Sequence, residues 1–271
     1  MSIRSGLKFG VKYLYVLIAG FSLLIFGIFS RKQRAYIQTL ADQFGWKKNA
    51  RAYPTPLPLF DPDLMLGGTE INILQPEGNP GNVTLLELVI LNALVKKSKA
   101  GHIFEFGTFD GRTTLNMAAN SGPTTRIYTL DLPAESAASF AATHDADDAK
   151  FAGKIQTGYK YKKTRFNEKI VSLEGDSSTY DYGPYRKSMD FIFIDGGHSL
   201  FFVENDTKNA LSMIRDGGTI AWHDYRSNCE GVTKVVNELY EKGGIYGNLR
   251  RVKGTNLAVL TPHTVDTILG M

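Results

Sequence analysis

Two apolar runs in the C-terminal half of the sequence end in pairs of ionisable residues. The run Met189–Ile194 leads into Asp195, with His198 three residues further on, and the run in "GGTIAWHDY" ends in His223 and Asp224. Buried strands of parallel sheets are apolar along their length, and ligands bind beyond the carboxyl ends of such strands. Carboxylates bind hard divalent cations, and an imidazole can accept a proton near neutral pH. The two strand ends therefore predict a site for metal binding and proton transfer.

The two aspartates are expected at the ends of neighbouring strands, which lie about 4.8 Å apart in a sheet. Two carboxylates at that separation repel each other, and one of them would stay protonated. A divalent cation removes this conflict and lowers the pKa of a substrate hydroxyl bound to it. We therefore expect Asp195 and Asp224 to bind Mg²⁺. His198 follows two glycines and is expected to act as the base.

A second polar set lies at a strand–helix junction, in "FEFGTFDGRTT". Gly107 allows a sharp turn and the close approach of a ligand, and Gly111 allows close helix packing. The middle glycine of the dinucleotide-binding fingerprint is absent, and Glu105 stands two residues before the first glycine. A carboxylate there would repel a pyrophosphate but can accept a hydrogen bond from a ligand ammonium group.

Acidic residues also end the next two strands. Asp131 follows Gly107 by 24 residues, which suits a ribose diol, and Asp176 in "EGDSS" can accept a hydrogen bond from an exocyclic amine. The expected cleft thus offers acceptors for an ammonium group, a diol and an adenine amino group, with no obvious basic residue for a phosphate. S-adenosylmethionine is cationic, carries an amino acid and lacks phosphate, so it matches this set.

This constellation resembles the class I S-adenosylmethionine-dependent methyltransferases over roughly residues 83–262. The resemblance implies that Asp131 binds the ribose and that Asp176 and Ser177 lie beside the adenine. Phe109 replaces the usual middle glycine of the glycine-rich motif. The residues implied in cofactor binding are Glu105, Gly107, Thr108, Gly111, Asp131, Asp176 and Ser177.

The segments around the two aspartates are similar to the metal-using small-molecule O-methyltransferases that include the cephamycin and macrolide-sugar enzymes. In that group the first Asp and an acidic pair after the next strand hold Mg²⁺, and the His is the proposed base. The resemblance implies that Asp195 and Asp224 bind the metal and that His198 takes the proton. His223 stands where the group can carry an acid, so it is either a third ligand or a structural residue.

Strands and helices alternate around these residues. The expected strands are 102–107, 126–132, 169–176, 189–195 and 218–224, and the expected helices are 84–95, 111–120, 134–149, 200–214 and 231–242. Two short strands joined by Gly254 and Thr255 are typical of a hairpin. The pattern predicts an α/β fold with a doubly wound, mostly parallel seven-stranded sheet and a C-terminal antiparallel hairpin.

Composition and charge limit the class of partner. The chain of 271 residues has 43% hydrophobic and 21% charged residues, which is typical of a globular protein. Nine of the 31 Lys/Arg but one of the 27 Asp/Glu lie in residues 1–51, so the remainder carries 22 basic and 26 acidic side chains. This remainder has no excess of positive charge, so no nucleic-acid partner is expected. The single cysteine, Cys229, excludes a disulfide framework and is expected in the core or a loop.

The segment Tyr13–Ser30 contains no charged residue and has basic residues on both sides. As a helix it would be about 27 Å long, close to the roughly 30 Å hydrocarbon core of a bilayer. A cleavable signal peptide is an alternative, but no small-x-small site precedes Arg31. A core or oligomer helix is another, but no polar face is present. We expect a membrane anchor, spanning or deeply interfacial, whose orientation the flanking charges do not decide.

The predicted organisation is an anchor in residues 1–34, a connector or cap in 35–82 and a methyltransferase domain in 83–271. The resemblance implies methyl transfer to a hydroxyl of a small or lipid-linked acceptor, whose binding walls are expected in 53–82 and 144–168. Because the donor is cytosolic, the domain is expected to face the cytoplasm.

Two other classes of protein fit parts of the pattern. An NAD(P)-dependent oxidoreductase would need the complete fingerprint G-x-G-x-x-G, which is missing. A non-catalytic, membrane-anchored binder of S-adenosylmethionine would keep the fold without turnover, and the set of Asp195, His198 and Asp224 weighs against it. The basic, aromatic segment 159–166 is expected to be a substrate lid, a lipid contact or a solvated loop. The acceptor and the oligomeric state stay open.

Overall fold

The computed structural model describes residues 3–26, 29, 34, 37, 52–133 and 157–261. The chain divides into two compact units, Met1–Ala52 and Tyr53–Met271. The expected helix at 134–149 lies outside the described residues. Most of the connector expected at 35–82 belongs with the second unit, because that unit begins at Tyr53.

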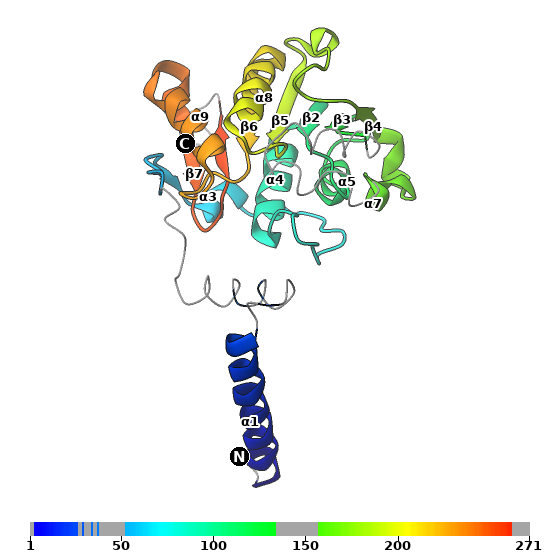
Figure 1. Ribbon diagram of the computed structural model, residues 1–271. Helices are drawn as coiled ribbons and strands as arrows, with labels where there is room; N and C mark the ends of the chain where they lie inside the picture. The colour runs from blue at the N-terminus through cyan, green and yellow to red at the C-terminus, as the bar shows by residue number, and fades with distance from the viewer. Residues whose placement is uncertain are drawn as a thin grey trace. The chain divides into compact units, whose positions relative to one another are not determined.

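The second unit is built on one eight-stranded sheet in the order β1-β7-β8-β6-β5-β2-β3-β4 (Figure 1). The strands are β1 (Leu59–Phe60), β2 (His102–Phe106), β3 (Arg126–Asp131), β4 (Ile170–Glu174), β5 (Met189–Ile194), β6 (Ile214–Trp222), β7 (Leu249–Val252) and β8 (Ala258–Leu260). Strands β4, β3, β2, β5 and β6 pair in parallel, and β8 pairs antiparallel with both β6 and β7. The predicted doubly wound sheet and terminal hairpin are confirmed.

The number of strands was predicted as seven, which is wrong by one. The additional strand β1 pairs in parallel with β7, with Pro58 O accepting from Arg251 N and Phe60 O accepting from Lys253 N. It lies in a proline-rich stretch that was read as a connector. Proline lacks the donor that an interior strand needs, so this two-residue pairing forms at the sheet edge, where prolines are tolerated.

Helices cover both faces of the sheet (Figure 1). They are α3 (Pro62–Leu66), α4 (Leu85–Ser98), α5 (Arg112–Ala119), α7 (Tyr159–Lys162), α8 (Leu200–Met213) and α9 (Glu230–Glu241), with short 3₁₀ turns at Arg165–Lys169, Gly183–Tyr185 and Gly244–Asn248. Strand β5 shows the layering: Phe191 and Phe193 pack in the cluster with α4, whereas Ile192 and Ile194 pack in the cluster with α8 and α9. Because successive strand side chains point to opposite faces, a strand with apolar residues on both faces must be covered on both sides.

Helix α5 fixes the backbone of the segment 72–83, which we call the strap. Asn120 donates to Asn72 O and accepts from Asn72 N, and Asn116 makes the same pair of bonds with Leu74. Arg112, one turn earlier on the same helix face, donates to three carbonyl groups of the region: Gln75 O, Pro76 O and Val83 O. The strap is therefore held against α5 by side chains that satisfy its backbone.

The first unit contains helix α1 (Ile3–Phe26), which begins ten residues before the uncharged run expected to be helical. The side chains of Tyr13–Ile18 are each 52–72% exposed. Successive residues turn by about 100°, so these six apolar or aromatic residues face every side of the helix. In the described part of the chain, no helix combines the length and the hydropathy needed to cross a bilayer.

Candidate active site

The carboxyl ends of the parallel strands surround a cavity of about 430 Å³. The hydrogen-bond ladder continues one residue past the strands, since Asp195 N donates to Phe106 O and His223 N donates to Ile194 O. These bonds bring residues from separate strand ends to a common edge. The predicted site residues that line the cavity are Gly107, Thr108, Asp131, Asp176, Ser177, Asp195, His198, His223 and Asp224.

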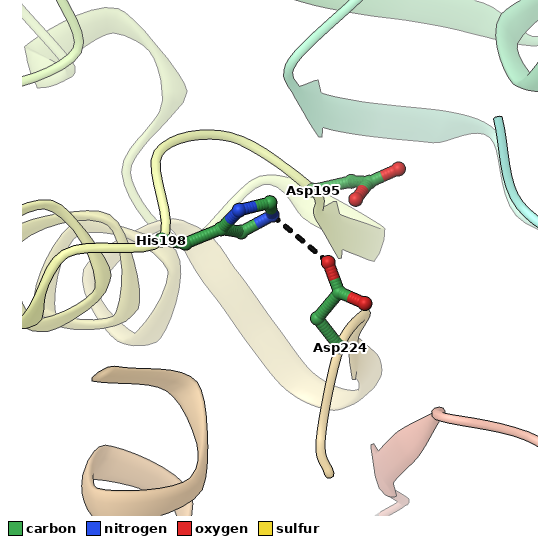
Figure 2. Close-up of side chains that lie close together, drawn as sticks. All are labelled: Asp195, His198 and Asp224. Atoms are coloured by element: carbon green, nitrogen blue, oxygen red, sulfur yellow. Dashed lines mark ion pairs between the residues drawn. The ribbon is translucent and has the colours of Figure 1, made fainter. Parts of the chain in front are cut away.

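The acidic and basic residues at the ends of β5 and β6 form one connected cluster. His198 Nε2 lies 2.9 Å from Asp224 Oδ2, and Figure 2 shows this pair beside Asp195. His223 Nδ1 lies 2.9 Å from Asp195 Oδ1 and 3.6 Å from Asp224 Oδ2. Arg226 adds a contact of 3.2 Å to Asp224 Oδ1. Each carboxylate therefore has a cationic or protonatable partner from the protein itself.

The electrostatic balance of this cluster follows from these contacts. Burial opposes the charged form of each group, but the surrounding partners outweigh it. The pKa of Asp224 is lowered to about 2, chiefly by the hydrogen bond from His198 and the positive charges around it. The pKa of His198 is raised because Asp224 outweighs desolvation. The pKa of His223 is raised well above its usual value by Asp195, Glu87 and Asp224, which together outweigh its burial.

His223 was expected as a metal ligand or a structural residue, and its geometry favours the structural role. Its side chain is 10% exposed, with Nδ1 against Asp195 and Nε2 at 3.3 Å from Glu87 Oε2. Both ring nitrogens thus contact carboxylates, so neither points to a separate metal position. The ligand atoms of Asp195, His198 and Asp224 instead lie within 4.8 Å of one another. This group, with His198 in place of His223, could hold a cation.

The donor set fits a divalent cation. Two carboxylates are suitable ligands for Mg²⁺, which prefers oxygen, whereas an imidazole is more typical of transition metals. If Asp195 and Asp224 are its protein ligands and oxygens of water or substrate complete its coordination, the cation fits the prediction of Mg²⁺. A cation that also recruits His198 would favour a softer ion such as Mn²⁺ or Fe²⁺.

Glu87 is a site residue that the sequence analysis missed. Glu87 is the N3 residue of a capping box at the start of α4: Glu87 N donates to Thr84 Oγ1, and Glu87 Oε2 accepts from Thr84 N. The same carboxylate accepts from Asn256 N and contacts His223. Burial raises its pKa, but His223 and these backbone donors lower it to about 2.

Further residues line the cavity without having been singled out, among them Phe202, Asp206, Arg226 and Asn256. They come from a helix, a loop after β6 and the terminal hairpin, and no local motif marks them. Their participation follows from the packing of α8 and of the hairpin against the strand ends.

The glycine-rich loop adopts the backbone that the motif requires. Gly107 has φ of 87°, and a side chain there would clash with the carbonyl group of Asp195. Phe109, which replaces the usual glycine, has φ of 50° in the left-handed region, and its N–H donates to Asp131 Oδ2 at 2.7 Å. Such a conformation is strained for a residue with a side chain and is typical of functional loops. Gly111 lies outside the cavity lining and leaves space for the ring of Tyr161.

Asp131 and Asp176 are oriented by the backbone around them. Asp131 accepts from Phe109 N through Oδ2 and from Leu132 N through Oδ1. Burial raises its pKa, and these donors oppose the shift. Asp176 Oδ1 accepts from the backbone and hydroxyl of Ser178. Carboxylate oxygens have several lone pairs, so both residues can accept further hydrogen bonds from a ligand.

Glu105 requires a correction, because its side chain does not line the cavity. It is 0% exposed, and its Oε2 accepts from Thr114 Oγ1 at 2.5 Å and from Thr129 Oγ1 at 2.6 Å. Its Oε1 has no hydrogen-bond partner among the residues that the structure describes. Burial raises the pKa of Glu105 to about 8, so the group is largely neutral at pH 7. In this conformation a direct ion pair with a ligand ammonium group is not expected.

The segment 159–166 is not simply a solvated loop. Lys160 is buried and lies 3.0 Å from Asp110 Oδ2, and Tyr161 packs against Gly111. Asp110 also accepts from Asn82 of the strap. The basic and aromatic residues at the start of this segment thus support the glycine-rich loop.

Comparisons with known proteins agree with the site. Residues 104–225 match a family described as "Methyltransferase domain", and this segment contains all eleven residues predicted from the sequence to form the site. A search of curated proteins finds no match to the chain. The match confirms the resemblance to class I methyltransferases.

Similar folds occur among solved structures. The calicheamicin methyltransferase CalS11 is 17% identical with a TM-score of 0.50, covering 65% of this chain and 79% of its own, which supports the fold. The O-methyltransferase TomG from Streptomyces achromogenes, in complex with SAM, is 18% identical with a TM-score of 0.45 over 73% of this chain and 95% of its own. An O-methyltransferase from Bacillus cereus, in complex with SAH, is 16% identical with a TM-score of 0.44 over 84% and 97% of the two chains.

The buried carboxyl group of Glu105 predicts a pH dependence of stability. Its pKa in the folded chain is about 8 against an ordinary value of 4.5, so between these values the folded state holds a proton that the unfolded state has lost. The free energy of unfolding should therefore fall as pH rises from about 5 to 8, by at most about 1.4 kcal/mol per pH unit. Denaturant unfolding of the ligand-free protein should show a flatter profile for Glu105→Gln. The exposed Glu168→Gln serves as the control, and parallel profiles for wild type and Glu105→Gln would refute the prediction.

Proposed function

Because the chain is a class I methyltransferase, we propose that it transfers the methyl group of S-adenosylmethionine to a hydroxyl group of an acceptor. The observation that carries the proposal is the pair of His198 and Asp224, 2.9 Å apart, in the same cavity as Asp131 and Gly107. His198 and Asp224 are suited to removing a proton from a hydroxyl group. Asp131 and Gly107 are suited to binding a nucleoside that carries no phosphate. Arg112, the basic residue in the glycine-rich segment, is bound to carbonyl groups and so offers no free cation to a phosphate at this loop.

The residues of the site divide the reaction between them. When bound, S-adenosylmethionine supplies an electrophilic methyl carbon on a sulfonium ion. Asp131 and the glycine-rich loop hold the nucleoside, which orients that carbon toward the acceptor. His198 takes the hydroxyl proton while the acceptor oxygen bonds to the methyl carbon and the carbon–sulfur bond breaks, its electron pair remaining on sulfur. Asp224 then stabilises the protonated imidazole of His198.

Replacement of His198 tests this assignment. With methyl-labelled donor and total cell extract, we expect His198→Gln to lower label transfer at least about 100-fold, because the proton acceptor is lost. Calorimetry should show nearly unchanged binding of S-adenosylmethionine to this variant, and weaker binding to Asp131→Asn. Binding of NADH in place of S-adenosylmethionine would favour an oxidoreductase. Binding of S-adenosylmethionine without labelled product would favour a non-catalytic binder.

We further propose that a divalent cation assists the reaction, held by Asp195 and Asp224. Bound there, it would lower the pKa of the acceptor hydroxyl and fix its oxygen. The spacing of the ligand atoms within 4.8 Å supports this proposal. His198 then remains the base, as the sequence predicts.

Metal removal separates this proposal from methyl transfer itself. The chelated protein should regain turnover with Mg²⁺ or Mn²⁺, and calorimetry should detect one cation per chain in the wild type but none in Asp195→Asn. Unchanged turnover after chelation, together with no detectable cation binding, would reject metal assistance and leave methyl transfer standing. The imidazoles and Arg226 would then suffice to balance the two carboxylates.

The third proposal concerns location: α1 associates with a membrane, and the catalytic unit faces the cytoplasm, where the donor is made. The exposed apolar residues of Tyr13–Ile18 support it, since a helix that is apolar on all sides needs a non-aqueous environment. Basic residues before and after this run favour anionic headgroups.

Vesicle flotation of the full chain tests the location. The wild type should float with vesicles of mixed neutral and anionic lipids, and the double variant Leu14→Glu, Ile18→Glu should stay in solution because both charges would enter the lipid. Ile245→Glu alters an exposed apolar residue of the second unit and should float as the wild type does. Flotation of the double variant would show that α1 is not responsible.

A further inference from the structure

Three exposed apolar residues are adjacent in sequence to residues that line the cavity. Leu85 and Leu86 begin α4 and are 49% and 38% exposed, and Phe201 in the first turn of α8 is 59% exposed. We call these three residues the apolar rim. The residues on either side of the two leucines, Thr84 and Glu87, line the cavity.

The rim lies on the same edge of the sheet as the site for topological reasons. Helix α4 precedes β2 and helix α8 follows β5, so both helices begin at the carboxyl edge of the parallel strands. The contact of Glu87 with His223 holds the first turn of α4 at the cavity. The ring of Phe201 stacks edge-on against Phe202, which lines the cavity, with centroids 5.1 Å apart.

Both helices have polar N-caps, Thr84 and Ser199, so the apolar residues that follow have no capping role. Exposed apolar side chains beside a cavity with polar catalytic groups can extend its contact surface for a ligand. A strongly polar acceptor such as a sugar would gain nothing from such a surface. The rim therefore indicates an acceptor with an apolar portion that extends out of the cavity.

Arg226 adds a second, independent feature of the acceptor side. Within the described chain it is the one Lys or Arg that lines the cavity. Its guanidinium contacts Asp224 through one terminal nitrogen, while its Nε is buried and has no hydrogen-bond partner among the described residues. The Arg226 side chain is 43% exposed, so an anionic ligand group in the cavity can approach its guanidinium.

We propose that the acceptor is an anionic amphiphile, whose hydroxyl lies at His198, whose carboxylate or phosphate binds Arg226 and whose apolar tail crosses the rim. This proposal rests on the proposed methyl transfer and names the class of its acceptor. The apolar helix α1 of the same chain is consistent with it, because acceptors of this kind partition into lipid. Arg226 and the rim act as specificity residues, whereas His198 performs the chemistry.

Calorimetry with simple probes tests the proposal on the full chain saturated with S-adenosylhomocysteine. The probes are octyl phosphate, octanoate, octanol and inorganic phosphate, each below its aggregation concentration. We expect octyl phosphate or octanoate to bind at least tenfold more tightly than octanol and inorganic phosphate. The better of the two anionic probes identifies the anion that Arg226 prefers.

Matched variants locate the binding. Leu86→Gln and Phe201→Ser should each weaken binding of the anionic probe about tenfold, and Arg226→Gln should remove its advantage over octanol. Ile245→Gln, an exposed apolar residue away from the cavity, should leave binding unchanged. Loss of binding in Leu17→Gln but not in the rim variants would assign the probe to α1 and overturn the proposal.

The two proposals fail in distinguishable ways. If S-adenosylhomocysteine itself does not bind, the methyl-transfer function fails. If it binds to the wild type and to every variant, the variants are folded. Equal affinity for octyl phosphate, octanoate, octanol and inorganic phosphate would then overturn the acceptor class alone.

Discussion

The site depends on the neutralisation of negative charge at the carboxyl edge of the sheet. Three carboxylates, from Glu87, Asp195 and Asp224, converge there at low exposure, and each would be costly without a partner. His223 lies between Glu87 and Asp195, and His198 contacts Asp224. This pairing lowers the pKa of Glu87 and Asp224 and so favours their ionised forms, although burial opposes it. It also places the imidazole of His198 next to the carboxylate of Asp224, an arrangement suited to accepting a proton from a hydroxyl group.

The same interactions connect the site to the rest of the fold. Glu87 caps α4, accepts from Asn256 in the terminal hairpin and contacts His223, so one side chain links a helix, a hairpin and the strand end. On the opposite side of the cavity, Asp110 joins the glycine-rich loop to the strap and to Lys160. Both halves of the site are thus supported by segments that are remote in sequence.

The two halves differ in chemistry. The half of the cavity proposed to bind the nucleoside presents Asp131 and Asp176, and the nearby acid Glu105 is enclosed by threonine hydroxyls and largely neutral at pH 7. The half proposed to bind the acceptor presents the imidazole cluster and Arg226, with exposed apolar residues next to it in sequence. A cationic nucleoside on one side and an anionic amphiphile on the other would each meet groups of suitable charge.

Much of this protein could be read from its sequence, because the signals are local. Strand periodicity and the glycine-rich turn identified the sheet, the order of its parallel strands along the chain and nine of the residues that line the cavity. What only the tertiary structure decided depends on contacts between distant segments. Glu105 follows the motif but is buried, and His223 contacts Glu87, a carboxylate 136 residues away in the chain. Strand β1 pairs with β7 at the sheet edge, although the prolines around it argued against a strand. Burial and pairing of a charged group are set by its neighbours in space, and these are not encoded in the residues beside it in the chain.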